Sequence, residues 1–209
     1  MNAKRTTLLE MGLRELPALT FPSSSRNGES LDTDEAAVWK RVLNYRLASY
    51  LRPNRLLETH PGVGISTILY RHASPKTRLV TLDDALRCRK CLIDFIDIDP
   101  FGAPWQSLEE VSCLISRDTV VQISNGEAHS VRRNLKRGQK YPTQYAGRLL
   151  PKWVINEYLP QLQSFLGLDV QFFYAFPTTV RAILSKTSLP NYLWRDCPQW
   201  MWWLEKYAC

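Results

Sequence analysis

The stretch Leu92-Ile93-Asp94-Phe95-Ile96-Asp97-Ile98-Asp99-Pro100-Phe101-Gly102-Ala103-Pro104 decides how this sequence folds. Residues 92–98 are mainly aliphatic or aromatic, which is typical of a buried strand. From Asp99 the pattern changes to acid, proline and glycine, so we expect the strand to end there in a tight turn. Acids at the end of an apolar strand cost free energy unless they are paired or used. The stretch therefore predicts a functional strand end, with Asp99 as an ordinary turn or helix cap as the alternative.

Strand-like and helix-like stretches alternate on both sides of this strand. Strands are expected at 55–58, 78–84 and 118–124, followed by a hairpin at 168–176 and 179–184. Helices are expected at 33–51, 65–72, 105–117 and 147–166. Such alternation predicts an α/β sandwich with a mostly parallel sheet that ends in an antiparallel hairpin.

The chain of 209 residues has the length of one domain with tails. Residues 1–32 are expected to form an N-terminal arm or loop, and residues 33–186 the α/β domain. Residues 187–209 form a tail rich in tryptophan, with Trp194, Trp200, Trp202 and Trp203. We expect the tail to pack on the domain, or to form a contact with a partner or a second copy in a homodimer.

Composition excludes several classes of protein. With 44% hydrophobic and 22% charged residues, the chain resembles an ordinary globular protein. No apolar run reaches the roughly 18–20 residues that a membrane span needs. The residues after Met1 lead into no apolar stretch of signal-peptide length, so we do not expect secretion. The 5 cysteines are odd in number, which favours reduced thiols and a cytoplasmic location. Cys88 and Cys91 have no second ligand pair, so no metal site is expected.

The net charge of +7 comes from one segment. Residues 128–156 contain no acid, and removing their basic residues from the 27 of the chain leaves 20, equal to the number of acids. Localised positive charge is typical of a surface that binds a polyanion, and an ordinary solvated face is the alternative. The candidate phosphate-binding residues are Arg132, Arg133, Lys136, Arg137 and Lys140.

Two further strand ends carry residues that suit a nucleotide-like ligand. Glu58 ends the first expected strand and precedes a loop with His60, Gly62 and Gly64, and Asp83 and Asp84 end the second. Ligands of parallel sheets bind at the carboxyl ends of the strands, where glycine allows close approach and carboxylates bind ribose hydroxyls. A dehydrogenase is disfavoured because its Gly-x-Gly-x-x-Gly motif would need glycine at position 67, which is threonine.

These motifs resemble those of one enzyme class. Residues 56–64, Leu-Leu-Glu-Thr-His-Pro-Gly-Val-Gly, resemble the first motif of Rossmann-like S-adenosylmethionine-dependent methyltransferases. Residues 97–104, Asp-Ile-Asp-Pro-Phe-Gly-Ala-Pro, resemble the Asp-x-Asp-Pro-Phe-Gly-Ser-Pro of tRNA guanine-N2 dimethyltransferases. Residues 179–183, Thr-Val-Arg-Ala-Ile, are similar to the terminal hairpin of that family. The resemblance covers roughly residues 52–186.

The resemblance implies roles for individual residues. S-adenosylmethionine would be the cofactor, and its implied binding residues are Glu58, His60, Gly62, Gly64, Asp83, Asp84 and Asp97. Asp99 would accept a hydrogen bond from the target amine together with the carbonyl of Pro100, and Phe101 would stack on the base. Catalysis would then consist mainly of positioning, and the base would have to leave its helix.

The sequence departs from this class between the second and third strands. Only residues 85–91 separate the two expected strands, whereas a parallel crossover needs about ten to twelve residues. The class usually has a helix, a strand and another helix there, so we expect a sheet reduced after residue 84. The sequence predicts a methyltransferase that acts on an exocyclic amine of a nucleic-acid base, RNA rather than DNA. The alternative is a non-catalytic nucleic-acid-binding or scaffolding protein on a degenerate methyltransferase fold.

Overall fold

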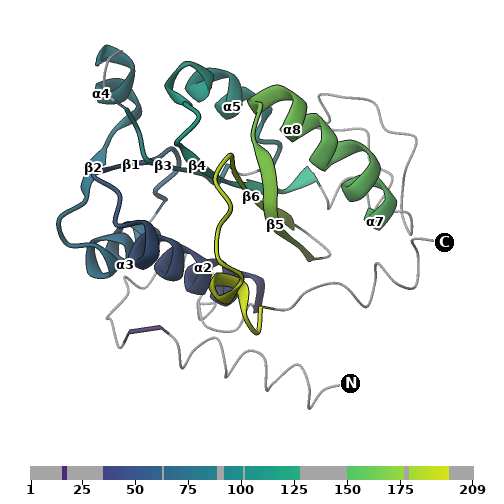
Figure 1. Cartoon of the computed structure of the whole chain (residues 1–209), viewed down its shortest axis with the longest axis horizontal. Helices are drawn as coiled ribbons and strands as arrows, with labels where there is room; N and C mark the ends of the chain where they lie inside the picture. The colour runs from purple at the N-terminus through teal and green to yellow at the C-terminus, as the bar shows by residue number, and fades with distance from the viewer. Residues whose placement is uncertain are drawn as a thin grey trace. The chain divides into compact units, whose positions relative to one another are not determined.

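The structure is a computed structural model that describes residues 16–17, 35–62, 64–88, 92–100, 102–127, 150–176 and 179–197. A six-stranded sheet runs through it in the order β2-β1-β3-β4-β6-β5 (Figure 1). The strands are β1 (Arg55–Glu58), β2 (Arg78–Val80), β3 (Phe95–Ile98), β4 (Val120–Asn125), β5 (Asp169–Phe176) and β6 (Thr179–Ser185).

The strand directions confirm the expected α/β fold with an antiparallel end. β1 pairs with β3, and β3 with β4, in parallel. β6 runs antiparallel to both β4 and β5, so β5 has the same direction as β4. Every residue of β3 and β4 is buried, including the polar Asp97, Gln122, Ser124 and Asn125, so both faces of these strands are covered.

The connection between β2 and β3 differs from the sequence-based expectation. β2 ends at Val80, and the short helix α4 (Leu82–Arg87) follows at once. Thr81 ends the strand because its side chain accepts a hydrogen bond from the backbone of Asp84 and caps the helix. Residues 81–94 are therefore available for the crossover, and the predicted strand over 78–84 is wrong at its end. No strand lies beyond β2 in the described part of the chain, as expected for a sheet reduced after residue 84.

The contacts divide the chain into two compact units. The smaller contains the described residues of Met1–Asn54, Pro61–Arg78 and Asn191–Pro198. Its helices are α2 (Glu35–Leu51), α3 (Ile65–Ala73) and the 3-10 turn η4 (Asn191–Trp194). Asn44 on α2 donates a hydrogen bond to Ser66 at 2.9 Å, and Arg46 donates to the carbonyl of Leu193 at 2.9 Å. The buried Trp194 belongs to this unit, whereas Trp200, Trp202 and Trp203 lie outside the described residues.

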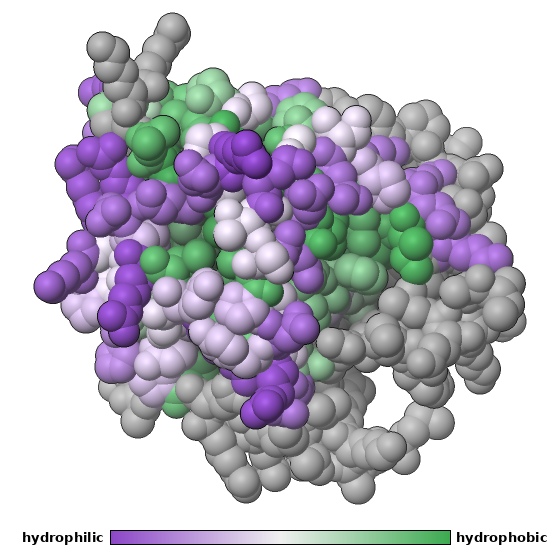
Figure 2. Space-filling model, viewed as in Figure 1, coloured by the Kyte–Doolittle hydropathy of each residue, from purple (hydrophilic) through white to green (hydrophobic). Residues whose placement is uncertain are grey.

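The surface of the described residues is mixed in character. Figure 2 shows hydrophilic side chains over much of the visible face, with hydrophobic ones in smaller areas between them. No described helix combines the length and the apolar character that crossing a membrane requires. Cys113 and Cys197 are free thiols, but Cys88 is disulfide-bonded, so the expectation of reduced thiols is wrong at that position.

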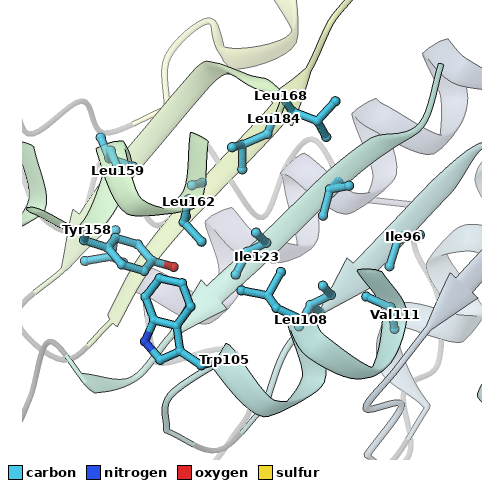
Figure 3. Close-up of a cluster of buried hydrophobic side chains, with 14 of the residues drawn as sticks. Ile96, Trp105, Leu108, Val111, Ile123, Tyr158, Leu159, Leu162, Leu168 and Leu184 are labelled. Atoms are coloured by element: carbon cyan, nitrogen blue, oxygen red, sulfur yellow. The ribbon is translucent and has the colours of Figure 1, made fainter. Parts of the chain in front are cut away.

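The larger unit contains the sheet and the helices on one of its faces. These are α4, α5 (Trp105–Val111) with the 3-10 turn η1 (Ser112–Leu114), and the helical segment that begins at Leu150 (Figure 1). Alternate residues of each strand, such as Ile96 and Ile98 on β3, pack against this layer. Figure 3 shows the rings of Trp105 and Tyr158 directed toward one another, 6.0 Å apart and edge to face.

The last helical segment is continuous but changes its winding. α7 (Leu150–Trp153) leads into the π-helical turn η3 (Val154–Tyr158) and then α8 (Leu159–Leu166). Pro160 lies in the first turn of α8 and has no N–H to donate to the preceding turn, which explains the interruption. The π turn places Trp153 and Tyr158 in a stacked pair with ring centroids 5.3 Å apart.

Candidate functional site

The carboxyl ends of β1 and β3 lie side by side. Glu58 pairs in register with Asp97, and the amide of Thr59 donates a hydrogen bond to the carbonyl of Asp97 at 3.0 Å. Parallel pairing thus brings residues that are separated in the chain by α3, β2 and α4 to one edge of the sheet. The carboxylates of Glu58, Asp97 and Asp99 belong to this edge.

Asp97 is completely buried. It lies between Ile96 and Ile98, which face the α5 side of the sheet, so strand alternation turns its carboxylate to the opposite face. There, one carboxylate oxygen accepts hydrogen bonds from Arg181 at 3.0 Å and from Gln122 at 3.3 Å. These bonds compensate the charge that burial would otherwise leave without partners. Asp97 is thus held by side chains of β4 and β6.

Arg181 joins the two acids of β3. Its guanidinium lies on β6 directly opposite Ser124, to whose hydroxyl it donates a hydrogen bond. The same nitrogen lies 3.7 Å from a carboxylate oxygen of Asp99. The side chains of Arg181 and Asp97 are each 1% exposed, whereas that of Asp99 is 22% exposed. Asp99 is therefore the member of the ion-pair group that a ligand can reach.

Asp99 is not the N-cap residue of α5. That position is held by Pro104, which makes no side-chain capping hydrogen bond. The expected helix over 105–117 is also shorter than predicted, because it becomes a 3-10 turn at Ser112. Asp99 instead combines an ion pair with partial exposure, and such a carboxylate can accept a hydrogen bond from an N–H or O–H group of a ligand.

The loop after Asp99 is fixed to the end of β4. Gly102 has a φ of +109°, a conformation that side chains disfavour. The amide of Gly126 donates a hydrogen bond to the carbonyl of Gly102 at 2.8 Å. A Cβ atom on Gly126 would lie 3.1 Å from the backbone nitrogen of Gly102, so a side chain there would require the loop to shift by a few tenths of an ångström. Asp99 and Pro100 therefore belong to a loop that is bound at its middle.

A second polar cluster follows β4. The buried carboxylate of Glu127 accepts hydrogen bonds from the indole of Trp105 at 3.3 Å and the amide of Asn125 at 3.2 Å. Burial of the Tyr158 hydroxyl raises the pKa of that group well above its ordinary value, and the nearby charge of Glu127 raises it further. The Asn125 side chain offsets a part of this effect.

Sequence reasoning assigned no role to Arg181 or to this second cluster. A basic residue inside the apolar run Val180-Arg181-Ala182 was a usable signal for Arg181, because a buried arginine needs a carboxylate partner. Glu127 had no such signal, since it stands at the start of a segment that reads as polar and basic.

The two glycines of the loop after β1 belong to the smaller unit. Gly62 and Gly64 have φ values of +53° and +82°, and an added Cβ on either would meet no atom within 4 Å. Gly64 caps α3, and its amide donates to the carbonyl of Pro61 at 2.8 Å. Glycine is thus required here by backbone conformation. His60 belongs to the larger unit, is exposed and lies 2.7 Å from the hydroxyl of Thr59 through its Nδ1 atom.

The remaining predicted residues have different positions. Asp83 and Asp84 are exposed in the first turn of α4, where acids suit the helix dipole, rather than at the end of a strand. Pro100 is partly buried in the loop after β3. Phe101 and the basic residues Arg132, Arg133, Lys136, Arg137 and Lys140 lie outside the described residues.

Comparisons with known proteins show the fold. No protein-family model matches the sequence, and no curated protein matches it. A solved structure assigned as a caffeoyl-CoA O-methyltransferase from Staphylococcus aureus is similar with a TM-score of 0.54 and 12% identity, over 88% of this chain and 99% of the other. Trm1 from Pyrococcus horikoshii, in complex with S-adenosyl-L-methionine, has a TM-score of 0.53 and 14% identity, over 79% of this chain and 58% of its own.

At 12% and 14% identity, the similarity to these two structures concerns the fold. The chain has the α/β fold of the Rossmann-like methyltransferases.

Proposed function

We propose that this protein transfers a methyl group from S-adenosylmethionine to an exocyclic amine of a nucleic-acid base, with RNA the favoured target and the guanine N2 amine of tRNA the first to test. The observation that carries the proposal is that the two acids at the end of β3 lie in different environments. Asp97 is enclosed and ion-paired, while Asp99, next to Pro100, is ion-paired and 22% exposed at the same edge of the sheet. A site of this kind presents a hydrogen-bond acceptor to a ligand, while the ion pair continues to hold that acceptor in place.

The residues present fit the cofactor in their donor chemistry. Glu58 is a partly buried acid at the carboxyl end of a parallel strand, which suits the hydroxyl or ammonium groups of such a ligand. Gly62 and Gly64 follow it in the chain with positive φ angles and open space where a side chain would stand. His60, Asp83 and Asp84 stay predictions from the resemblance. The bound cofactor would supply an electrophilic methyl group on a positively charged sulfur.

Asp99 would position the acceptor. Its carboxylate would accept a hydrogen bond from one N–H of the amine, with the Pro100 carbonyl as a second acceptor, and so direct the nitrogen lone pair at the methyl carbon. Transfer would form a new C–N bond at the amine nitrogen, and the cofactor's sulfur, as the leaving group, would keep the electron pair of the C–S bond. The methylated nitrogen then releases a proton along the hydrogen bond to Asp99 and on to water. Positioning of this kind accounts for most of the expected rate.

The test combines cofactor binding with transfer. We expect calorimetric titration to show binding of S-adenosylmethionine, and a tritium assay to show methyl transfer to a tRNA pool. Asp99→Ala should keep cofactor affinity within about threefold and lower transfer by about 100-fold or more, because it removes a hydrogen bond that positions the acceptor. Asp94→Ala is a matched control, because Asp94 directly precedes β3 and accepts a hydrogen bond from the Arg55 amide at 2.9 Å, at the opposite end of the strand.

Two results would contradict the proposal. Absence of cofactor binding at millimolar concentration would remove the catalytic function and favour the non-catalytic nucleic-acid-binding alternative. Undiminished transfer by Asp99→Ala would instead show that another group positions the acceptor.

A further inference from the structure

We propose that Arg181 is a positioning residue of the methyl-transfer site, one that acts on the acceptor amine only through Asp99. Its guanidinium would hold the Asp99 carboxylate charged and in one orientation, at the edge of the sheet where the amine is presented. The inference rests on the proposed function, and it assigns a role that the strand-end motifs themselves do not contain.

The geometry gives Arg181 three acceptors on two neighbouring strands. One terminal nitrogen donates to Asp97 at 3.0 Å, and the other donates to Ser124 and lies 3.7 Å from Asp99. A guanidinium is planar and carries its donors in a fixed fork, so contacts with Asp97 and Ser124 fix its orientation. The position of the charge that faces Asp99 is therefore determined by two buried groups.

The electrostatics require such a cation. Asp97 and Asp99 point to the same face of β3, and two close carboxylates disfavour each other's charged forms unless a cation lies between them. Arg181 is that cation, because its two terminal nitrogens each lie within 4.0 Å of one of these carboxylates. The side chain of Asp97 is 1% exposed and that of Asp99 is 22% exposed, so the two acids have different roles. Asp97 holds the arginine, and the arginine holds the carboxylate that a ligand reaches.

A lysine should not replace this arginine. Its ammonium is a single point charge on a flexible stem and cannot make the same planar set of contacts with Asp97, Ser124 and Asp99. Arg181→Lys would keep the charge of the core while relaxing the orientation of Asp99. The misplacement of a catalytic group by about 1 Å can cost about 100-fold in rate, which sets the expected size of the effect.

The experiment distinguishes a role of Arg181 in positioning Asp99 from a role in stabilising the folded core. Arg181→Met alone removes the cation that pairs with the buried Asp97, so the decisive variant is the double substitution Asp97→Asn with Arg181→Met, compared with Asp97→Asn and with Arg181→Lys. The matched control is Lys186→Met, which breaks an exposed ion pair with Asp169 at 3.3 Å on the same hairpin. For each protein we would measure thermal unfolding, calorimetric affinity for S-adenosylmethionine, and kcat and KM for methyl transfer to tRNA.

We expect the double variant to fold and to bind the cofactor within about threefold of Asp97→Asn, while its kcat falls by about 100-fold relative to that single variant with little change in KM. Arg181→Lys should lower kcat by at least about tenfold, and Lys186→Met should behave as the wild type. If the double variant retains the kcat of Asp97→Asn, or if Arg181→Lys retains wild-type kcat, Arg181 only neutralises Asp97 and the inference is overturned. A wild-type protein without cofactor binding or transfer would overturn the proposed function, and this inference with it.

Discussion

Asp97 and Asp99 show how position on a strand gives one residue type two environments. Alternation places both on one face of β3, but Asp97 lies within the paired part of the strand and Asp99 lies just past its end. The first is surrounded by neighbouring strands, and the second has one open side. A carboxylate at a strand end can thus be supported by the sheet and still be reached by a ligand.

Tyr158 leads to a prediction about pH. Its pKa is raised by burial and by Glu127, so the folded state keeps the proton to higher pH than the unfolded state, whose phenol titrates near pH 10. The stabilisation that this gives is complete below about pH 10 and is lost as the pH rises further. The free energy of unfolding should therefore fall above pH 10 by up to about 1.4 kcal/mol per pH unit from this group.

Urea unfolding of the wild type and of Tyr158→Phe between pH 8 and 11 would check this. The variant should show a shallower decline above about pH 10, because it has no phenol to titrate there. Tyr192→Phe is the control, since the Tyr192 side chain is 57% exposed. Parallel declines for all three proteins would contradict the prediction.

At the scale of elements, the loop between β3 and α5 is the part of the fold on which the site depends. It carries Asp99 and Pro100, and Gly102 approaches Gly126 so closely that a Cβ atom on Gly126 would lie 3.1 Å from the Gly102 backbone nitrogen. The contact is between backbone atoms, which cannot turn away as a flexible side chain can. Any increase in size at Gly126 must therefore move the loop or the end of β4.

Gly126→Ala should consequently lower both stability and methyl transfer. We expect a loss of about 1–3 kcal/mol in the free energy of unfolding, the usual cost of overpacking, and a fall in kcat because Asp99 moves with the loop. Chemical denaturation and the transfer assay would measure the two effects. Gln106→Ala, an exposed change on the adjacent helix, should alter neither. Wild-type activity in Gly126→Ala would show that the loop is not positioned by this contact.

At the scale of the whole molecule, the distribution of charge is the main feature that bears on a nucleic-acid substrate. The excess of +7 is contributed by residues 128–156, and the remainder of the chain is neutral. We propose that this segment binds the phosphates of the substrate, which would supply affinity without sequence specificity.

Salt dependence tests that proposal. If Arg132, Arg133, Lys136 and Arg137 contact phosphates, replacing all of them with glutamine should reduce the slope of log affinity against log salt by about three for tRNA. A control variant with glutamine at the exposed Arg71, Lys76, Arg87 and Arg117 should keep the wild-type slope. Equal slopes for all proteins would mean that the segment is an ordinary solvated surface.

Local patterns predicted most of the elements and one part of the site. The runs at 55–58 and 179–184 are strands, and the strand before Asp99 ends at Ile98, because strand propensity acts over a few residues. Asp83 and Asp84 were placed at a strand end because the apolar run continues to Leu82. The structure ends β2 at Val80, since the Thr81 cap starts a helix there.

The sequence by itself determined that acids stand at the end of a buried strand in an α/β fold, because apolar periodicity and the change to Asp-Pro at residue 99 are local properties of the chain. Only the tertiary structure decided which group compensates those acids. Arg181 is 84 positions from Asp97 in the sequence. The two meet because β4 pairs with β3 on one side and with the antiparallel β6 on the other. Pairing between distant strands is fixed by the packing of the whole sheet, so no short pattern in the sequence records it.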